Sequence, residues 1–368
     1  PVAFVAERHE ALTAIRRDLH AHPELGFEEH RTAALVAERL RQWGIEVHAG
    51  VGRTGVVGVI RGRAERSGRS IGLRADMDAL PIGEENEFAH RSLRRGLMHA
   101  CGHDGHTTML LGAAQYLAAT RGFDGTVYAI FQPGEEGHAG ARAMIDDGLF
   151  TRFPADEVYA LHNWPGLPLG HIGLNPGPMM AAADRVRITL SGRGGHGAHP
   201  HLTVDPVLMA AQVIAAAQSI VARNVAPLEA AVLSLCAVQA GNLEAFSVVP
   251  REAHISGTVR AFNHSVQATI EARLRELAQS TARAYGGSAE VSYERMYPAT
   301  INHQPQYEFA AAVAEDLVGR DKVARNLPPS MGAEDFSFML QARPGCYARL
   351  GQGGGEDCWL HSTRYDFN

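Results

Sequence analysis

The hydrophobic pattern of the first half of the chain alternates between helix-like and strand-like segments. Residues 6–21 and 30–43 carry apolar side chains at spacings near three and four, and residues 107–119 are rich in Ala and Leu, which predicts helices. Short apolar runs typical of buried strands lie at 56–60, 71–75, 126–131 and 158–161. This alternation predicts an α/β domain with a mostly parallel sheet.

The pattern changes after Ala183. Strands are expected at 185–190, 230–239, 253–262 and 289–293, and helices at 205–223 and 266–285. The order β-α-β-β-α-β is that of the ferredoxin-like fold, which forms a compact unit of its own. A helix at 307–318 then returns to the first domain. The sequence thus predicts a discontinuous larger domain, residues 1–183 and 296–368, with a ferredoxin-like domain, residues 184–295, inserted into it.

The composition narrows the class of protein. The chain has 368 residues, 45% hydrophobic and 20% charged, and its net charge is −6. This charge argues against partners that demand a basic surface, so we expect neither nucleic acid nor a membrane as partner. The opening segment does not make a signal peptide and no run of about eighteen apolar residues occurs, so we expect a cytoplasmic protein with reduced cysteines. Nineteen histidines prompt a search for metal chemistry.

Polar side chains stand where the predicted strands end. Asp76 and Asp78 follow the strand at 71–75, Glu135 and Glu136 follow 126–131, and His162 follows 158–161. Ligands of doubly wound sheets bind at the carboxyl ends of strands, so these groups are expected to converge. A glycine-rich stretch, Gly351 to Gly355, is expected to be a mobile loop.

Each candidate has an ordinary structural alternative when it is considered alone. Cys101 and His103 are two residues apart on a predicted loop, a spacing that allows both to reach one metal pair, although Cys-x-His is more often structural. Glu135 and Glu136 at a strand end would point to opposite sides, so that one binds metal and the other acts as a base; the alternative is a solvated acidic turn. Together with His162 and His361 they form the mixed N, O and S set that borderline transition metals take.

Longer motifs make the sequence similar to the M20 metallopeptidase and amidohydrolase family, in particular its aminoacylase, hippurate hydrolase and auxin-conjugate hydrolase branch. The resemblance runs from about residue 10 to the C-terminus, and its motifs are Asp18–Leu25, Leu73–Pro81, Met98–His106, Phe131–Gly137 and Met331–Phe336. It implies a zinc-peptidase-like catalytic domain and an inserted lid and dimerisation domain. It also implies two divalent transition-metal ions, Zn, Mn, Co or Ni, with the ligands Cys101, His103, Glu136, His162 and His361.

The resemblance assigns further roles. Cys101 stands where other branches have a bridging Asp, and Asp78 is the acidic residue that orients a ligand histidine. Asp76 replaces the usual first histidine ligand, so His103 is expected to serve instead. The implied reaction is hydrolysis of the amide bond of an N-acyl amino acid, with Glu135 as the general base.

The inserted domain matches the family at substrate-facing positions. The resemblance implies that His196 reaches the site of a neighbouring subunit in a homodimer or a dimer-based homotetramer. It also implies that Arg260 binds the substrate carboxylate, and Ser247 stands where the family usually has a substrate-binding Asn. A dipeptidase of the same family and a catalytically silent dimeric binding module are the alternatives. Because Glu135 and all five ligands are retained, the enzyme is favoured over the silent module.

Overall fold

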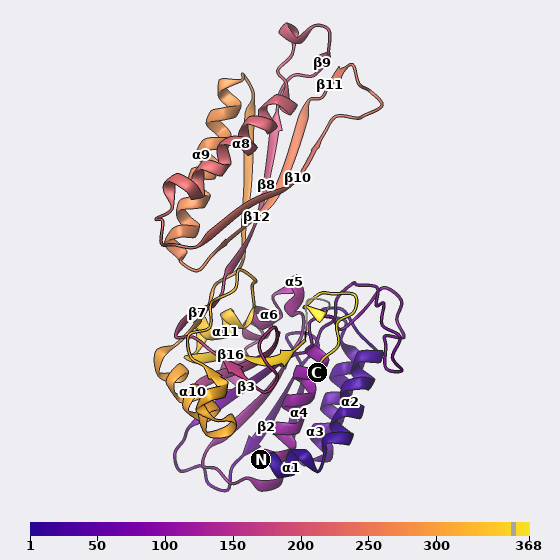
Figure 1. Cartoon of the computed structure of the whole chain (residues 1–368), viewed down its shortest axis with the longest axis vertical. Helices are drawn as coiled ribbons and strands as arrows, with labels where there is room; N and C mark the ends of the chain where they lie inside the picture. Colours follow the sequence, from indigo (N-terminus) through magenta and orange to yellow (C-terminus); the bar gives the residue numbers. More distant parts are fainter. Residues whose placement is uncertain (355–357) are drawn as a thin grey trace. The chain divides into compact units, whose positions relative to one another are not determined.

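The computed structural model describes residues 1–354 and 358–368 and divides them into two compact units (Figure 1). The larger unit contains residues 1–179, 300–329 and 335–368, and the smaller unit contains residues 180–299 and 330–334. The assignment of catalysis to one unit and of a lid to the other stays a prediction.

The larger unit is built on one eight-stranded sheet. Its strands are β1 (Glu46–Val51), β2 (Gly55–Arg61), β3 (Ser70–Asp76), β4 (Thr126–Gln132), β5 (Glu157–Pro165), β6 (Ile172–Gly173), β15 (Val323–Ala324) and β16 (Gly345–Gly353). They lie in the order β1-β2-β4-β3-β5-β16-β6-β15. The central strands β4, β3, β5 and β16 are parallel, and β1 and β2 join antiparallel to their neighbours. Strand β6 is antiparallel to β16 and parallel to β15. The predicted mostly parallel sheet is confirmed.

Helices of the larger unit pack against this sheet or against one another. They are α1 (Val2–Ala6), α2 (His9–Ala21), α3 (His30–Gln42), α4 (His103–Thr120), α5 (Glu135–His138), α6 (Gly140–Asp146), α7 (Leu149–Arg152), α10 (Gln304–Val318) and α11 (Phe336–Ala342), with a 3-10 turn η2 (Arg320–Lys322). One core cluster joins Leu40 of α3 and Leu111 of α4 to Phe131 of β4. The helix expected at 6–21 is present as α2, but it begins at His9, because a turn separates it from the short helix α1.

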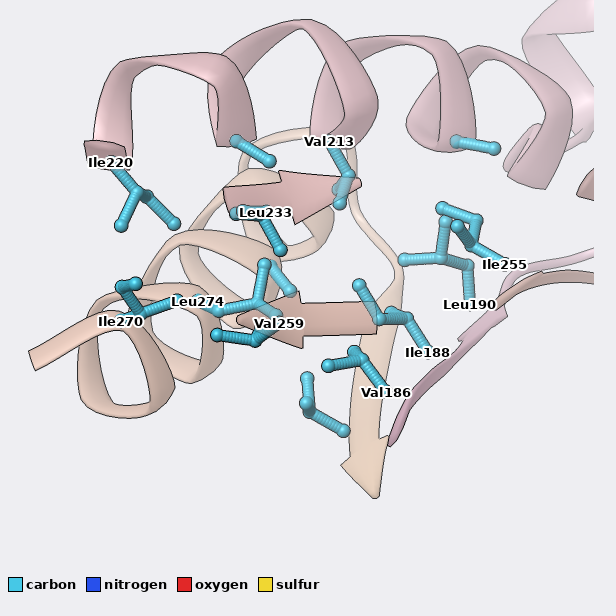
Figure 2. Close-up of a cluster of buried hydrophobic side chains, with 14 of the residues drawn as sticks. Val186, Ile188, Leu190, Val213, Ile220, Leu233, Ile255, Val259, Ile270 and Leu274 are labelled. Carbon is cyan, nitrogen blue, oxygen red and sulfur yellow. The ribbon is translucent and has the colours of Figure 1, made fainter. Parts of the chain in front are cut away.

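The smaller unit has the predicted order of six main elements. They are β8 (Ala182–Ser191), α8 (Pro206–Asn224), β10 (Ala231–Ala240), β12 (Glu252–Ala261), α9 (His264–Ala284) and β13 (Ser288–Tyr297). The strands form an antiparallel sheet in the order β10-β12-β8-β13. Branched residues of the sheet, such as Ile188 and Val259, pack with Val213 of α8 and Leu274 of α9 (Figure 2). Alternate residues of the strands therefore build the core with one face of each helix.

Short elements complete the description. Strands β9 (Gly195–His196) and β11 (Val248–Val249) pair at one end of the smaller unit, near the 3-10 turn η1 (Pro200–Leu202). Strands β7 (Gly177–Met180) and β14 (Thr300–Asn302) form a second two-stranded sheet.

Helix α8 is long and apolar enough to cross a membrane by length and hydropathy alone. In the structure, its residues Met209, Val213, Ala217 and Ile220 are buried in the core of the smaller unit. Their spacing of three and four residues places them on one face, as expected for a helix that packs on a sheet. The cytoplasmic location stays a prediction.

The glycine-rich stretch differs from the expected loop. Gly351 and Gly353 belong to β16 and pair with Trp164 and Pro165 of β5. Backbone pairing with a neighbouring strand needs no side chain, so the glycine content did not reveal it. Gly355 lies outside the described residues.

Candidate metal centre

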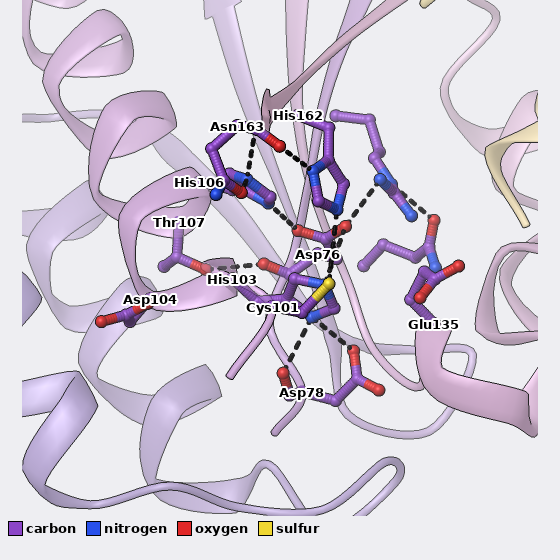
Figure 3. A network of polar contacts seen from close by, with 12 residues as sticks. Asp76, Asp78, Cys101, His103, Asp104, His106, Thr107, Glu135, His162 and Asn163 are labelled. Atoms are coloured by element: carbon purple, nitrogen blue, oxygen red, sulfur yellow. Dashed lines mark hydrogen bonds and ion pairs between the residues drawn. The ribbon is translucent and has the colours of Figure 1, made fainter. Parts of the chain in front are cut away.

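Donor side chains gather at the carboxyl ends of the central parallel strands (Figure 3). Asp76 ends β3, Glu135 follows β4 at the start of α5, and His162 lies in the last part of β5. Helix α4 begins at this edge with His103, directly after Cys101 and Gly102. The expected convergence of these groups is therefore present in the structure.

Cys101 lies between two sets of donors. Its Sγ is 3.6 Å from Nε2 of His162. Donor atoms of Cys101, Glu136 and His361 also lie within 4.8 Å of one another, and Oε1 of Glu136 is 3.1 Å from Nε2 of His361. A thiol with donors on both sides fits a position shared by two metal ions.

His103 is oriented by Asp78. Its Nδ1 is 2.8 Å from the backbone oxygen of Asp78 and 3.3 Å from Oδ1 of the same residue. Its Nε2 is buried and makes no hydrogen bond, although it lies 3.6 Å from Oδ2 of Asp76. One donor atom each of His103, Glu135 and Glu136 lie within 4.8 Å of one another. A histidine held through one nitrogen, with the other left free among carboxylates, is arranged as metal ligands usually are.

The charges of this cluster are compatible with the binding of cations. Burial alone lowers the pKa of His103, but Asp76 and Asp78 outweigh it and raise the pKa to about 10. Burial, with the charges of Glu136 and Glu135 added, raises the pKa of the Cys101 thiol well above its usual value. Several acidic groups thus lie close together, and the buried cation Arg74 pairs with Asp76 among them. Divalent ions would reduce the repulsion among these acidic groups, so the donor set fits a metal pair.

Two residues without an assigned metal role complete the buried network. Nδ1 of His106 is 2.6 Å from Oδ1 of Asp76, and Nε2 of His106 is 2.7 Å from Oδ1 of Asn163. The backbone oxygen of Asn163 lies 2.7 Å from Nδ1 of His162, which directs Nε2 of that ring toward Cys101. In the sequence, His106 could have been found from its position three residues after His103, because residues three apart lie on one face of a helix.

Comparison with known proteins identifies the family of this chain. The sequence model of the peptidase family M20/M25/M40 matches residues 72–368. The chain belongs to this family. It is 42% identical over 354 residues to a hippurate hydrolase of Campylobacter jejuni, covering 96% of this chain and 91% of the relative. It is 38% identical to an N-acetylcysteine deacetylase of Bacillus subtilis, covering 96% of this chain and 91% of the relative.

A solved structure is also similar. A dinuclear metal-binding peptidase of the M20 family from Bacillus subtilis superposes with a TM-score of 0.84 at 33% identity, and the match covers 100% of this chain and 94% of that chain. The resemblance to the M20 family that the motifs indicated is confirmed.

Three local expectations about this M20 site are wrong, although the residues themselves converge. His103 is the first residue of α4 and not part of a loop. The hydrophobic pattern missed this start because the first turn of α4 is polar although it is buried. Glu135 and Glu136 belong to the short helix α5, which Gly134 precedes with a left-handed backbone, φ +57°. The backbone at Glu135 and Glu136 therefore turns and is not extended as it would be in a strand. His162 lies inside β5.

The smaller unit carries the remaining predicted residues of the family. His196 is exposed in β9 opposite Val248, and the backbone oxygen of Ser247 accepts a hydrogen bond of 2.7 Å from the backbone N–H of Gly197. Arg260 is half-buried near the other end of the sheet, opposite Ala183. The structure thus brings His196 and Ser247 together and keeps Arg260 apart from them. Their roles stay predictions.

Gly102 joins the two predicted ligands Cys101 and His103. Its φ is +89°, and a Cβ at this position would lie 2.5 Å from Oδ1 of Asn163 and 2.5 Å from the hydroxyl of Tyr365. Both contact atoms belong to buried residues, so they have little room to move. The close approach of the Cys101–His103 segment to β5 therefore requires glycine.

We expect Gly102→Ala to lower the free energy of unfolding by about 1 to 2 kcal/mol for the left-handed backbone and by a further ~1 to 3 kcal/mol for the overlap. It should also weaken metal binding. Gly96→Ala is the matched control, since Gly96 has φ +80° and nothing within 4 Å of its Cβ position. Urea unfolding of both variants measures the difference; equal losses would show that the contacts of Gly102 tolerate a methyl group.

A second buried polar cluster lies behind the first turn of α4. Nδ1 of His20 is 2.9 Å from Oδ2 of Asp104, and its Nε2 is 3.1 Å from Oε1 of Glu84. Burial alone lowers the pKa of His20, but the hydrogen bonds to Asp104 and Glu84 outweigh it and raise the pKa to about 9. His20 is therefore charged in the folded protein at neutral pH, and it links α2 to α4.

This pKa predicts how stability depends on pH. The folded pKa of His20 is above the unfolded value near 6.5, so the stabilisation is complete below about pH 6.5 and is lost as the pH rises through 9. The difference in unfolding free energy between wild type and His20→Gln should shrink by roughly 3 kcal/mol between pH 6 and pH 10. Tryptophan fluorescence during urea unfolding measures it, because Trp43, Trp164 and Trp359 all lie in the larger unit. A constant difference would contradict the charged state of His20.

Proposed function

We propose that this M20 protein hydrolyses the amide bond of N-acyl amino acids with two divalent transition-metal ions, Zn, Mn, Co or Ni. The observation that carries the proposal is the convergence of Cys101, His103, Glu136, His162 and His361 around one edge of the sheet, with Glu135 beside them. Two relatives support the substrate class by their names, a hippurate hydrolase and an N-acetylcysteine deacetylase.

The five ligands divide the work of holding the metal pair. Cys101 would be the donor shared by both ions, because it lies near His162 and also near Glu136 and His361. His103 would bind through Nε2, which makes no hydrogen bond, and Asp78 holds the ring through Nδ1. When bound, the metal ions polarise the scissile carbonyl and lower the pKa of water.

Glu135 is the general base of the proposed reaction. It is 7% exposed, and its Oε1 accepts a hydrogen bond of 3.3 Å from the backbone N–H of Asp335, which leaves the carboxylate ordered beside His103 and Glu136. In this position it takes a proton from the attacking water and passes it to the leaving nitrogen. Glu136 lies next to His361 and Cys101, where it would bind metal. The two adjacent carboxylates therefore have different roles in the proposed reaction.

The geometry of the smaller unit favours a dimer. Arg260 lies eight residues along β12 from Glu252, the end near which His196 is found. At a rise of about 3.4 Å per residue this separation is roughly 27 Å. An N-acyl amino acid is shorter than this, so one smaller unit cannot touch the same substrate with both residues. We propose that Arg260 of one subunit binds the substrate and that His196, with the neighbouring substrate-binding Ser247, comes from the partner in a homodimer or a dimer-based homotetramer.

The experiment that tests the function combines metal content with a substrate panel. Metal is measured by mass spectrometry, and N-acetyl, N-benzoyl and indole-acetyl amino acids are compared with dipeptides of the same amino acids. We expect about two metal ions per subunit and cleavage of the acyl derivatives. Preference for dipeptides would favour the alternative dipeptidase. Absence of any turnover in a metal-loaded protein would favour the silent binding module.

A further inference from the structure

Two of the proposed metal ligands each have a tryptophan two residues away in the sequence. Trp164 follows His162 by two residues on β5, so both side chains are on the same face of the strand. Trp359 precedes His361 by two residues. The two indole rings meet edge to face with centroids 6.2 Å apart, and the Trp164 ring is 6.4 Å from the His162 ring. An aromatic surface therefore adjoins the metal centre within the larger unit.

Trp164 is held rigidly by a buried arginine. The guanidinium carbon of Arg349 lies 3.7 Å from the centroid of the Trp164 ring, and Arg349 is 2% exposed. Its two terminal nitrogens donate hydrogen bonds to backbone oxygens of Pro328, at 3.1 Å, and Met179, at 2.9 Å. The Arg349 guanidinium thus stacks on the Trp164 ring and donates hydrogen bonds to backbone carbonyl groups.

Trp359 rests on the turn that follows β5 and keeps a large free surface. Gly166 has φ +85°, and a Cβ there would lie only 3.2 Å from Cζ3 of Trp359, so the indole packs on the backbone of this turn. Nevertheless 47% of Trp359 is exposed. A large aromatic side chain that lies next to a candidate metal centre with about half of its surface exposed is available to contact a ligand.

Resting on the proposed function, we propose that Trp164 and Trp359 form the acyl-group subsite and select flat aromatic acyl groups over the acetyl group. The amino-acid half of the substrate carries a carboxylate, which needs a cation or free N–H donors. Arg349, the cation that lies over the Trp164 ring, is buried and has both terminal nitrogens engaged by carbonyl groups, so these nitrogens are not available to a carboxylate. The uncharged acyl half therefore fits this surface. An aromatic ring stacks on an indole, whereas a methyl group covers little of it.

The test varies the acyl group while the amino acid is kept constant. For metal-loaded Trp359→Ala, we expect kcat/KM for N-benzoyl and indole-acetyl derivatives to fall about 10- to 100-fold and that for the N-acetyl derivative to fall less than about threefold. Trp359→Phe should retain the aromatic preference. Phe309→Ala is the matched control, since Phe309 is a 58% exposed aromatic residue of α10 and should change neither value.

A binding measurement gives a readout that does not depend on turnover. Benzoate, added to the metal-loaded protein in a Trp43→Phe background, should change the fluorescence of the tryptophan pair, and Trp359→Ala should abolish most of this change. No Trp359-dependent change would overturn the subsite even if no amide were cleaved and the proposed function had failed.

Two kinetic outcomes would also overturn it. An equal loss for acetyl and benzoyl derivatives would show that Trp359 does not read the acyl group. A loss that follows the amino-acid side chain, in N-acetyl derivatives of alanine and phenylalanine, would place the aromatic surface on the other half of the substrate.

Discussion

Glu135→Gln is expected to bind metal as the wild type does and to lose turnover by about 10² to 10⁴-fold, the usual loss when a general base is removed. The change keeps the size of the side chain and its bond from the Asp335 backbone, but an amide cannot accept the proton of water. The loss should appear in kcat, because the base acts in the chemical step.

Glu136→Gln is the matched control for this experiment, since it is the same change one residue further along α5. It should lower metal content, because Glu136 lies with Cys101 and His361 in one donor group. Metal analysis and steady-state kinetics on both variants separate the two roles. A Glu135→Gln protein with nearly normal kcat would remove Glu135 from the mechanism.

His196→Ala is expected to lower kcat by about 10² to 10³-fold, which is typical for the loss of one donor to a developing oxyanion. His196 is exposed at the end of the smaller unit, where β9 pairs with β11. If it acts on the partner's site, mixing His196→Ala with Glu135→Gln subunits restores activity. Random exchange should return about a quarter of the wild-type activity, because half of the dimers are mixed and each has one complete site.

The control for complementation is a mixture of Glu135→Gln and Glu136→Gln subunits. Both residues belong to the same site within one subunit, so no mixed dimer has a complete site and activity should stay absent. Subunit exchange is verified by native mass spectrometry. If exchange occurs and the His196→Ala mixture remains inactive, His196 does not serve the neighbouring site.

The sequence alone determined the elements whose burial is periodic. The expected helix at 30–43 is α3, His30–Gln42, and the inserted β-α-β-β-α-β order agrees with the six main elements of the smaller unit. A regular alternation of apolar and polar residues reports the face that is buried, and this is a local property. The start of α4 escaped the pattern because His103 and His106 are buried polar residues, and burial at a site does not follow hydrophobicity.

The sequence also indicated that polar groups would converge, because strand ends in a parallel sheet share one edge, and the resemblance to the M20 family supplied the expected ligand set. The sequence could not determine which donors lie next to one another, because this depends on contacts between segments that are far apart along the chain. Cys101 meets His162 across 61 positions, and Glu136 meets His361 across 225. The tryptophan pair next to His162 is likewise formed by segments that only the fold brings together. Composition and spacing specify which groups are available, whereas distances, burial and the resulting pKa shifts exist only after the strands have paired and water has been excluded.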